Sequence, residues 1–215
     1  GATNQILQTD GFGIIGWTAM VSGSSLDAAY DFGGAGSGRI ITADAGVTEI
    51  NGTDGFLTTG SFGSGLAIGG ANGIPEGAGT RMFFNPAKAA FRAGLVTGSQ
   101  WDDVDVGIYS TAMGNNTRAS GNASTAMGNN TVATGIFSTA MGNTTNAEGN
   151  NSTAMGNNAS AIGIASTAMG ENTTASSDRS TAIGFGTTAS GSNSTAMGES
   201  TNAIGTSSTA MGNNT

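Results

Sequence analysis

The sequence has no cysteine and no histidine among its 215 residues. Without them the chain cannot form disulfides, a Cys/His zinc site or a catalytic triad that contains histidine. It also offers no nucleophile beside a base, no phosphate-binding glycine loop and no carboxylate pair placed for glycoside hydrolysis. We therefore expect no enzymatic activity and no cofactor.

Charge is scarce as well. Only 9% of the residues are charged, and six Lys and Arg stand against fourteen Asp and Glu, which gives a net charge of −8. The basic residues form no cluster, whereas nucleic-acid binding needs a basic patch. The longest apolar stretch, residues 13–21, is far shorter than a membrane-spanning helix. We therefore expect no nucleic-acid partner and no membrane insertion by this segment.

What the sequence has in abundance is glycine, with 38 residues, and a strict repeat. The pentapeptide Ser-Thr-Ala-Met-Gly, or its variant with Ile for Met, occurs eight times in residues 110–215, always 14 residues apart. A fixed period is typical of stacked-repeat architectures. Fourteen residues rich in Gly, Thr, Ser and Asn are too few for a helical hairpin and contain poor helix formers. Each repeat therefore predicts one coil with two short strands and two tight turns, the first at Gly128-Asn129-Asn130 and the second after Gly135.

Side chains alternate across a strand, so Thr and Met of the pentapeptide face one way and Ser, Ala and Gly the other. A second alanine column follows seven residues after the first. A glycine comes two residues later again in every full coil except at Ser177. We assign both alanine columns to the interior because small residues let two sheets approach closely. The alternative assignment places Met inside and Ala outside.

The first assignment leaves a column of methionine, with one isoleucine, on the outside. It consists of Met113, Met127, Met141, Met155, Met169, Ile183, Met197 and Met211. Soluble monomers rarely expose a continuous apolar patch, and burying one Met side chain contributes roughly 1.5–3 kcal/mol. The Met column is therefore predicted to be a subunit interface.

The pattern Ser-x-Ala-[Met/Ile]-Gly-x-x-x-x-Ala-x-Gly-x-x resembles the head repeat of YadA-like trimeric autotransporter adhesins and of related bacterial and phage fibre proteins. The resemblance covers residues 110–215 and implies a left-handed parallel β-roll, a β-solenoid. It further implies a homotrimer with the apolar faces toward the three-fold axis. An extracellular location, on a cell-surface appendage or a virion fibre, is implied too. The sequence departs from the family in having Thr where Val is frequent and Met where Ile is usual.

Two segments precede the repeats. Residues 1–76 are predicted to form an irregular β-rich lead-in, with short strands near residues 6–7, 14–17, 27–32, 39–42, 47–50, 56–59 and 66–68. Residues 77–109 are rich in aromatic side chains and predict a hairpin in which Pro86 takes the second position of a type I turn. This hairpin lies where a solenoid needs a cap over its first, open coil.

Asp102, Asp103 and Asp105 form the one dense acidic cluster of the sequence. Oxygen-rich loops can hold Ca²⁺, so these residues are the candidates for a metal site. Their spacing matches only part of a calcium-loop pattern. The alternatives are an Asx-turn or a salt bridge to an upstream basic residue: Arg81, Lys88 or Arg92.

These features predict a homotrimeric extracellular fibre segment, an adhesin or tail fibre, that mediates attachment to a glycan or protein of a host or neighbouring cell. A purely structural filament without a receptor site is the first alternative. An ice-binding β-solenoid is the second, because threonines also form a column. Ice-binding solenoids usually pair two threonines two residues apart, where this chain has Met or Ile. The asparagines after the repeat glycine are expected to be exposed turn residues.

Overall fold

The computed structural model describes residues 5–9, 15–19, 76–85 and 87–215. The chain divides into two compact units, residues 1–56 and 57–215. In the first unit, β1 (Gln5–Thr9) pairs antiparallel with β2 (Ile15–Ala19), close to the strands predicted near residues 6–7 and 14–17. The irregular β-rich lead-in over residues 1–76 stays a prediction. The strands predicted between residues 27 and 68 and the turn position of Pro86 lie outside the described residues.

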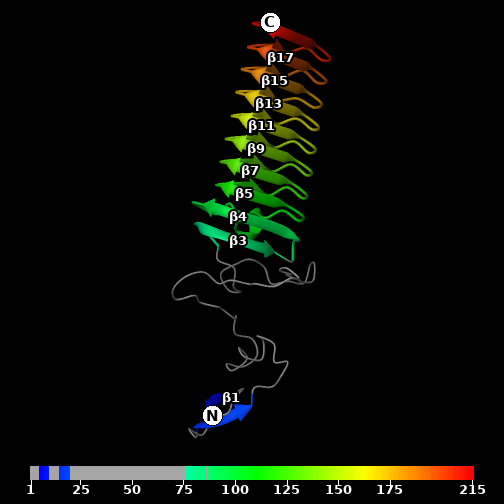
Figure 1. Cartoon of the computed structure of the whole chain (residues 1–215). Helices are drawn as coiled ribbons and strands as arrows, with labels where there is room; N and C mark the ends of the chain where they lie inside the picture. Colours follow the sequence, from blue (N-terminus) through cyan, green and yellow to red (C-terminus); the bar gives the residue numbers. More distant parts are fainter. Residues whose placement is uncertain (1–4, 10–14, 20–75, 86) are drawn as a thin grey trace. The chain divides into compact units, whose positions relative to one another are not determined.

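In the second unit, the repeats form a stack of coils, each with a five-residue and a two-residue strand except the last, which has only the five-residue strand (Figure 1). The long strands are β5 (Thr111–Asn115), β7 (Thr125–Asn129), β9 (Thr139–Asn143), β11 (Thr153–Asn157), β13 (Thr167–Glu171), β15 (Thr181–Phe185), β17 (Thr195–Glu199) and β19 (Thr209–Asn213). The short strands are β6 (Arg118–Ala119), β8 (Val132–Ala133), β10 (Asn146–Ala147), β12 (Ser160–Ala161), β14 (Thr174–Ala175), β16 (Thr188–Ala189) and β18 (Asn202–Ala203).

The coils build two sheets, one with ten strands that contains every long strand and one with seven strands that contains every short strand. Successive coils pair in parallel with a constant shift of 14 residues, so that Met155 lies between Met141 and Met169. The predicted all-β parallel solenoid of 14-residue coils is confirmed. Its left-handed sense and its trimeric assembly stay predictions.

The interior of the roll is lined by small side chains. Both alanine columns are buried except for Ala210 in the last coil, with Ala126 and Ala133 at 0% exposure in one coil, which confirms their assignment to the inside. The pentapeptide serines other than Ser208 are buried beside the first column, and in one coil the Ser124 hydroxyl donates to the Gly121 carbonyl at 2.6 Å. The two sheets can therefore pack closely because nothing larger than threonine separates them within the coils.

A buried threonine column was missed by the sequence interpretation. It consists of Thr117, Thr131, Thr145, Thr173, Thr187 and Thr201, with Ala159 in the coil between. Alternation could have revealed it, because each member lies two residues before the second alanine column. The Oγ1 atoms of these threonines have no hydrogen-bond partner among the described residues. The core therefore contains a row of unpaired hydroxyls.

The turns differ in detail from the prediction. Gly128 and Asn129 still belong to β7, and the bend falls at Asn130, whose φ is 51°. The second turn follows Gly135 as expected, with Phe137 at a φ of 58°. Gly128 itself, at φ 125°, does not face the interior but is exposed. Its backbone leaves the regular alternation, so the inward assignment of this glycine column is wrong.

The predicted hairpin is present as β3 (Gly79–Asn85) and β4 (Ala90–Val96), which pair antiparallel. It does not merely cover the roll: β4 pairs in parallel with β5 and so extends the ten-stranded sheet. After it, Trp101 is fully buried against the alanine core, and its Nε1 donates to the Thr117 carbonyl at 2.8 Å. A short 3-10 helix, η2 (Asp103–Asp105), follows. The boundaries predicted for this segment stay predictions.

Arg92 closes the interior at this end of the roll. Its side chain is fully buried, and its two terminal nitrogens donate to the carbonyls of Phe91, Ser110 and Ala119 and to the Ser110 hydroxyl at 2.8–3.0 Å. Burial lowers the pKa of Arg92 to about 10, which still leaves the guanidinium charged at neutral pH. A charged group therefore takes the place that alanine has in the coils, held by four hydrogen bonds.

Candidate interface on the outer face of the long-strand sheet

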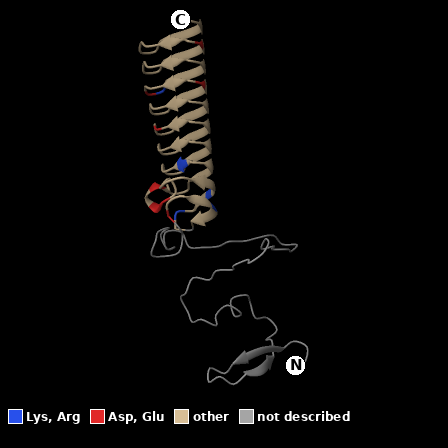
Figure 2. Ribbon diagram, turned by 90° about the vertical axis from the view of Figure 1, so that its left-hand side faces the viewer, with Lys and Arg blue, Asp and Glu red and all other residues tan. Residues whose placement is uncertain are grey.

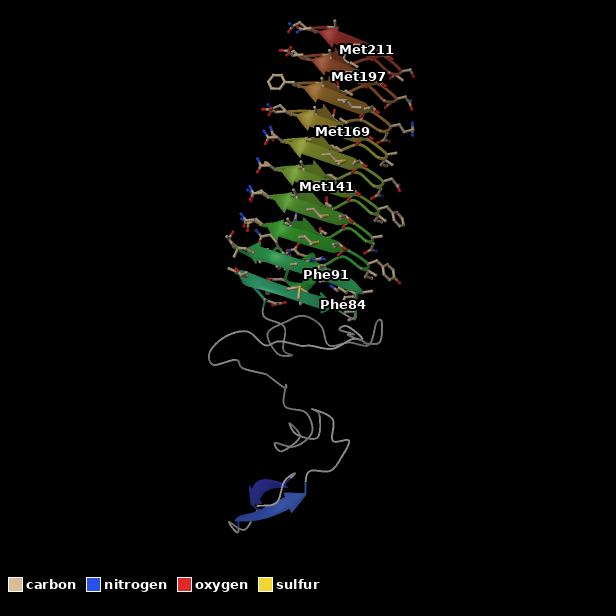
Figure 3. The ribbon with its side chains drawn as sticks, viewed as in Figure 1. Phe84, Phe91, Met141, Met169, Met197 and Met211 are labelled. Carbon is tan, nitrogen blue, oxygen red and sulfur yellow. The ribbon has the colours of Figure 1, made fainter. Side chains whose placement is uncertain are left out.

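The outer face of the ten-stranded sheet carries a Thr and a Met in every coil except one, where Ile183 replaces the Met. Thr153 and Met155 of β11 lie directly beside Thr167 and Met169 of β13, and this register repeats along the stack. Most members of the Met column are partly covered by their neighbours, while Met113 is 37% and Met211 60% exposed. The labelled methionines in Figure 3 form a line along the sheet. The structure thus places the predicted interface residues together on one face.

The hairpin continues this face beyond the repeats. Phe91 and Ala93 of β4 are in register with Thr111 and Met113 of the first coil. On β3, Phe84 lies opposite Phe91 and is 42% exposed, and both are labelled at the end of the Met line in Figure 3. Met82, which is 73% exposed, lies opposite Ala93 in the same way. We call Met82, Phe84, Phe91 and the Met column together the apolar sheet face.

Met82, Phe84 and Phe91 were missed as members of this face. The sequence interpretation assigned the whole aromatic segment to a cap. Alternation within residues 80–84 puts Met82 and Phe84 on one side, but only the pairing of β4 with β5 shows that it is the side of the Met column.

The opposite outer face, on the seven-stranded sheet, is not uniform. The outward position of its strands is taken in turn by Arg118, Val132, Asn146, Ser160, Thr174, Thr188 and Asn202. These side chains differ in size, charge and polarity and are mostly only partly buried. A surface that repeats the same apolar side chain suits a packed interface, whereas a variable polar surface suits solvent. The two faces of the roll therefore have different chemistry.

The asparagines after the repeat glycine end the long strands and form an amide ladder. Asn129 Nδ2 donates to Asn143 Oδ1 at 2.7 Å, and Asn143 Nδ2 donates to Asn157 Oδ1 at 2.8 Å. These residues are exposed at this end of β9 and β11. They were expected to be turn residues; instead they stabilise the stacking of coils through side-chain bonds along the roll.

The three aspartates proposed as a metal site have separate partners. Asp102 accepts a hydrogen bond from the Gly77 amide at 2.6 Å, Asp103 forms an ion pair with Lys88 at 3.0 Å, and Asp105 pairs with Arg118 at 3.4 Å. The predicted salt bridge is thus confirmed for Lys88, and Arg118 is a partner that was not foreseen. The described part of the chain contains no group of three acidic, Cys or His residues placed to hold a metal ion.

Charged side chains are otherwise sparse along the coils and gather near the hairpin and η2 (Figure 2). The described segments also contain no helix that is long and apolar enough to cross a bilayer. A solenoid with a small-residue core, few charged side chains on its coils and an apolar sheet face defines a structural repeat protein.

A family comparison agrees with this class. The model described as YadA head domain repeat, which holds two copies of the repeat, matches residues 106–131, 133–159, 161–187 and 189–215. Through residues 106–215 the chain therefore belongs to the YadA head family, a structural, adhesin-type family of surface proteins. A comparison with curated proteins found no match.

Proposed function

We propose that the chain is a segment of a homotrimeric extracellular fibre, in which three rolls pack side by side through the apolar sheet face. The observation that carries the proposal is the column of Met, with Ile183 in one coil, on one sheet, set against the variable and mostly polar surface on the other. A homotrimer buries the same face of each chain. Every coil must then present an apolar side chain there, as the repeats do.

The energetics favour assembly. The alanine core contributes little per residue, since a buried methylene-sized group is worth about 0.8 kcal/mol. A buried Met side chain contributes roughly 1.5–3 kcal/mol before entropy is charged, and this is an upper estimate. The apolar sheet face therefore offers the largest stabilisation still available to this thin roll.

The role that fits such a fibre is attachment to a host or neighbouring cell. Family membership supports an adhesin-like surface protein. The variable outer positions of the short-strand sheet supply hydroxyl and amide groups and the charge of Arg118, which a glycan or protein partner can use. A purely structural filament would need the same interface but no receptor site.

Two measurements test the proposal. Native mass spectrometry and sedimentation of the full chain should show three copies at micromolar concentration; a stable monomer contradicts the trimer. Beads coated with the trimer should then be retained on cell monolayers more than beads coated with serum albumin. A trimer that gives no retention favours the filament.

A further inference from the structure

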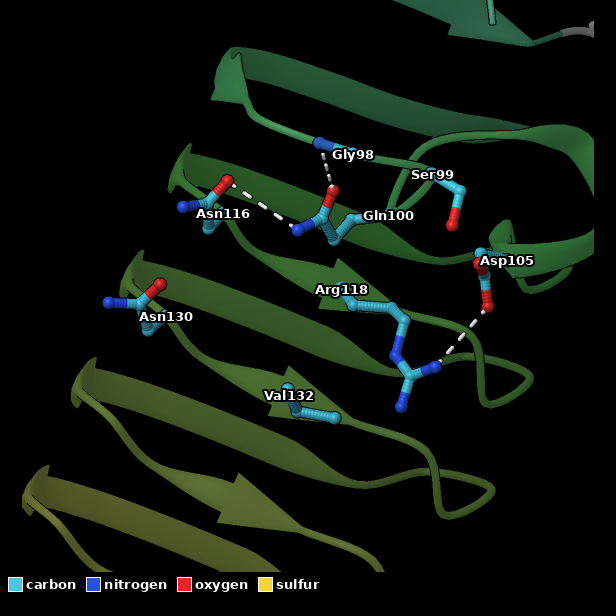
Figure 4. Close-up of a pocket in the computed structure, with 8 residues that line it drawn as sticks. All are labelled: Gly98, Ser99, Gln100, Asp105, Asn116, Arg118, Asn130 and Val132. Atoms are coloured by element: carbon cyan, nitrogen blue, oxygen red, sulfur yellow. Dashed lines mark hydrogen bonds and ion pairs between the residues drawn. The ribbon is translucent and has the colours of Figure 1, made fainter. Parts of the chain in front are cut away.

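A polar pocket of about 470 Å³ opens where the segment after the hairpin meets the first two coils (Figure 4). Gln100 lines it from the loop after β4, and Asn116 and Asn130 line it from the bends of two successive coils. Arg118 of β6 and Val132 of β8 contribute their outward side chains, and Asp105 contributes from η2. Such a volume lies within the range of small-ligand sites.

Several of the pocket's polar groups are held in place. Gln100 Oε1 accepts from the Gly98 amide at 3.0 Å, and Asn116 Oδ1 accepts from the amide and hydroxyl of Thr97 at 2.8 and 2.9 Å. Arg118 Nη1 lies 3.4 Å from Asp105 Oδ1. Groups that are already oriented lose less entropy when a ligand binds.

The lining determines the class of ligand. Amides, a guanidinium and a carboxylate offer both donors and acceptors, which suits a molecule covered with hydroxyls and does not suit an acyl chain. Arg118 and Asp105 balance each other, so the pocket has no surplus charge. An anionic ligand would be attracted by Arg118 and repelled by Asp105. A neutral ligand can hydrogen-bond to both side chains and needs no counter-charge.

The set of side chains that lines this pocket occurs once along the described roll. The position of Arg118 is taken in the later coils by Val132, Asn146, Ser160 and other uncharged residues, and the loop of Gln100 belongs to the segment before the repeats. Repetition therefore does not explain its chemistry. A trimer would carry three copies, and three linked weak sites can bind a multivalent surface much more tightly than one.

We propose that this pocket binds a neutral sugar unit, a hexose or N-acetylhexosamine, of a surface glycan. The inference rests on the proposed attachment function and names its site and ligand class. Arg118 donates to ring hydroxyls, Asp105 and the amides accept or donate beside it, and Val132 contacts the C–H face of the sugar.

The test is saturation-transfer NMR on the full chain with three probes: galactose, N-acetylglucosamine and N-acetylneuraminic acid. At least one neutral sugar should show saturation transfer, and the acidic sugar should show none. Arg118→Ser should weaken that binding at least tenfold. The matched control is Arg179→Ser, which removes the same charge from an exposed turn far along the roll and should change affinity less than twofold.

Both substitutions introduce a residue that the repeat already tolerates, since Ser160 takes the place of Arg118 and Ser207 that of Arg179 in other coils. Thermal melts should confirm that both variants fold. No binding to either neutral sugar, binding of the acidic sugar alone, or equal losses in the two variants would overturn the proposal.

Sedimentation of the same samples distinguishes a failure of the sugar-binding pocket from a failure of the trimeric assembly. A trimer without sugar binding rejects only the pocket, and a monomer that binds sugar rejects only the trimer.

Discussion

Gly142 lies so close to Gly156 in the next coil that a β-carbon on Gly142 would come within 2.0 Å of the Gly156 carbonyl oxygen. The same contact recurs between successive coils along this glycine column. The obstacle is backbone, so no side chain can move aside to relieve it. The repeat glycine is therefore required by the stacking of coils, in addition to its positive φ of 129°.

Gly142→Ala should consequently lower the free energy of unfolding by about 3 kcal/mol or more, because the clash separates two paired strands. Thermal melts followed by circular dichroism measure the loss. Gly186→Asn is the control: Gly186 has a φ of 62°, a β-carbon added to it would have its nearest neighbour 3.6 Å away, and Asn takes this place in other coils. Its effect should stay within about 0.5 kcal/mol. Similar losses in both variants would contradict the stacking argument.

Charged side chains introduced into the apolar sheet face test whether this face is the trimer interface. Met155→Asp combined with Met197→Asp places six carboxylates on the buried faces of a trimer, and burying an unpaired charge costs several kcal/mol even after relaxation. Sedimentation should show that the double variant no longer forms trimers at concentrations where the parent does.

The matched control replaces Ile162 and Ile204, seven residues after each methionine, with Asp. Their side chains are 43% and 71% exposed after the short strands, so the change in hydrophobicity and charge is similar but falls on the other side of the roll. This variant should remain trimeric. If it dissociates as readily as the Met variant, the apolar sheet face is not the interface.

The buried threonine column predicts a stabilising substitution. Thr145→Val keeps the shape of the side chain and removes a hydroxyl that has no partner among the described residues, and an unsatisfied buried group costs about 1–3 kcal/mol. The free energy of unfolding should rise by about 0.5–1 kcal/mol in urea titrations. Thr188→Val, at a partly exposed outer position, should change it by less than about 0.5 kcal/mol. A clear loss of stability in Thr145→Val would show that the hydroxyl is needed.

Arg92→Lys tests whether the buried guanidinium of Arg92 stabilises the hairpin end of the roll. The guanidinium reaches three carbonyls and one hydroxyl through its two terminal nitrogens, and a lysine ammonium cannot reproduce this forked geometry. We expect a loss of about 2–4 kcal/mol, because a buried charge would be left with fewer partners. Arg179→Lys, on an exposed turn, should be neutral in the same chemical denaturation experiment. Equal stability of Arg92→Lys and the parent would show that the two terminal guanidinium nitrogens are not needed for stability.

The repeat region was predictable from sequence because its determinants are local and periodic. The 14-residue period indicated the coil, and identical copies had to stack in one register. Strand alternation put Ala126 and Met127 on opposite sides, and the small size of the alanines, not the alternation, favoured the alanine side as the interior. The same alternation extends to Thr131, two residues before Ala133, so the buried threonine column is also encoded by the local sequence.

The strand pairing and side-chain placement at the hairpin end could not be predicted from the sequence, because no repeat specifies how a unique segment pairs with the first coil. The parallel pairing of β4 with β5 sends Phe91 to the apolar sheet face and Arg92 into the core, although the two residues are adjacent in sequence. The same docking brings η2 beside the first coil, where Asp105 meets Arg118 at one wall of the pocket. Periodicity specifies what neighbouring coils share, whereas contacts between unlike segments depend on a register that only folding sets.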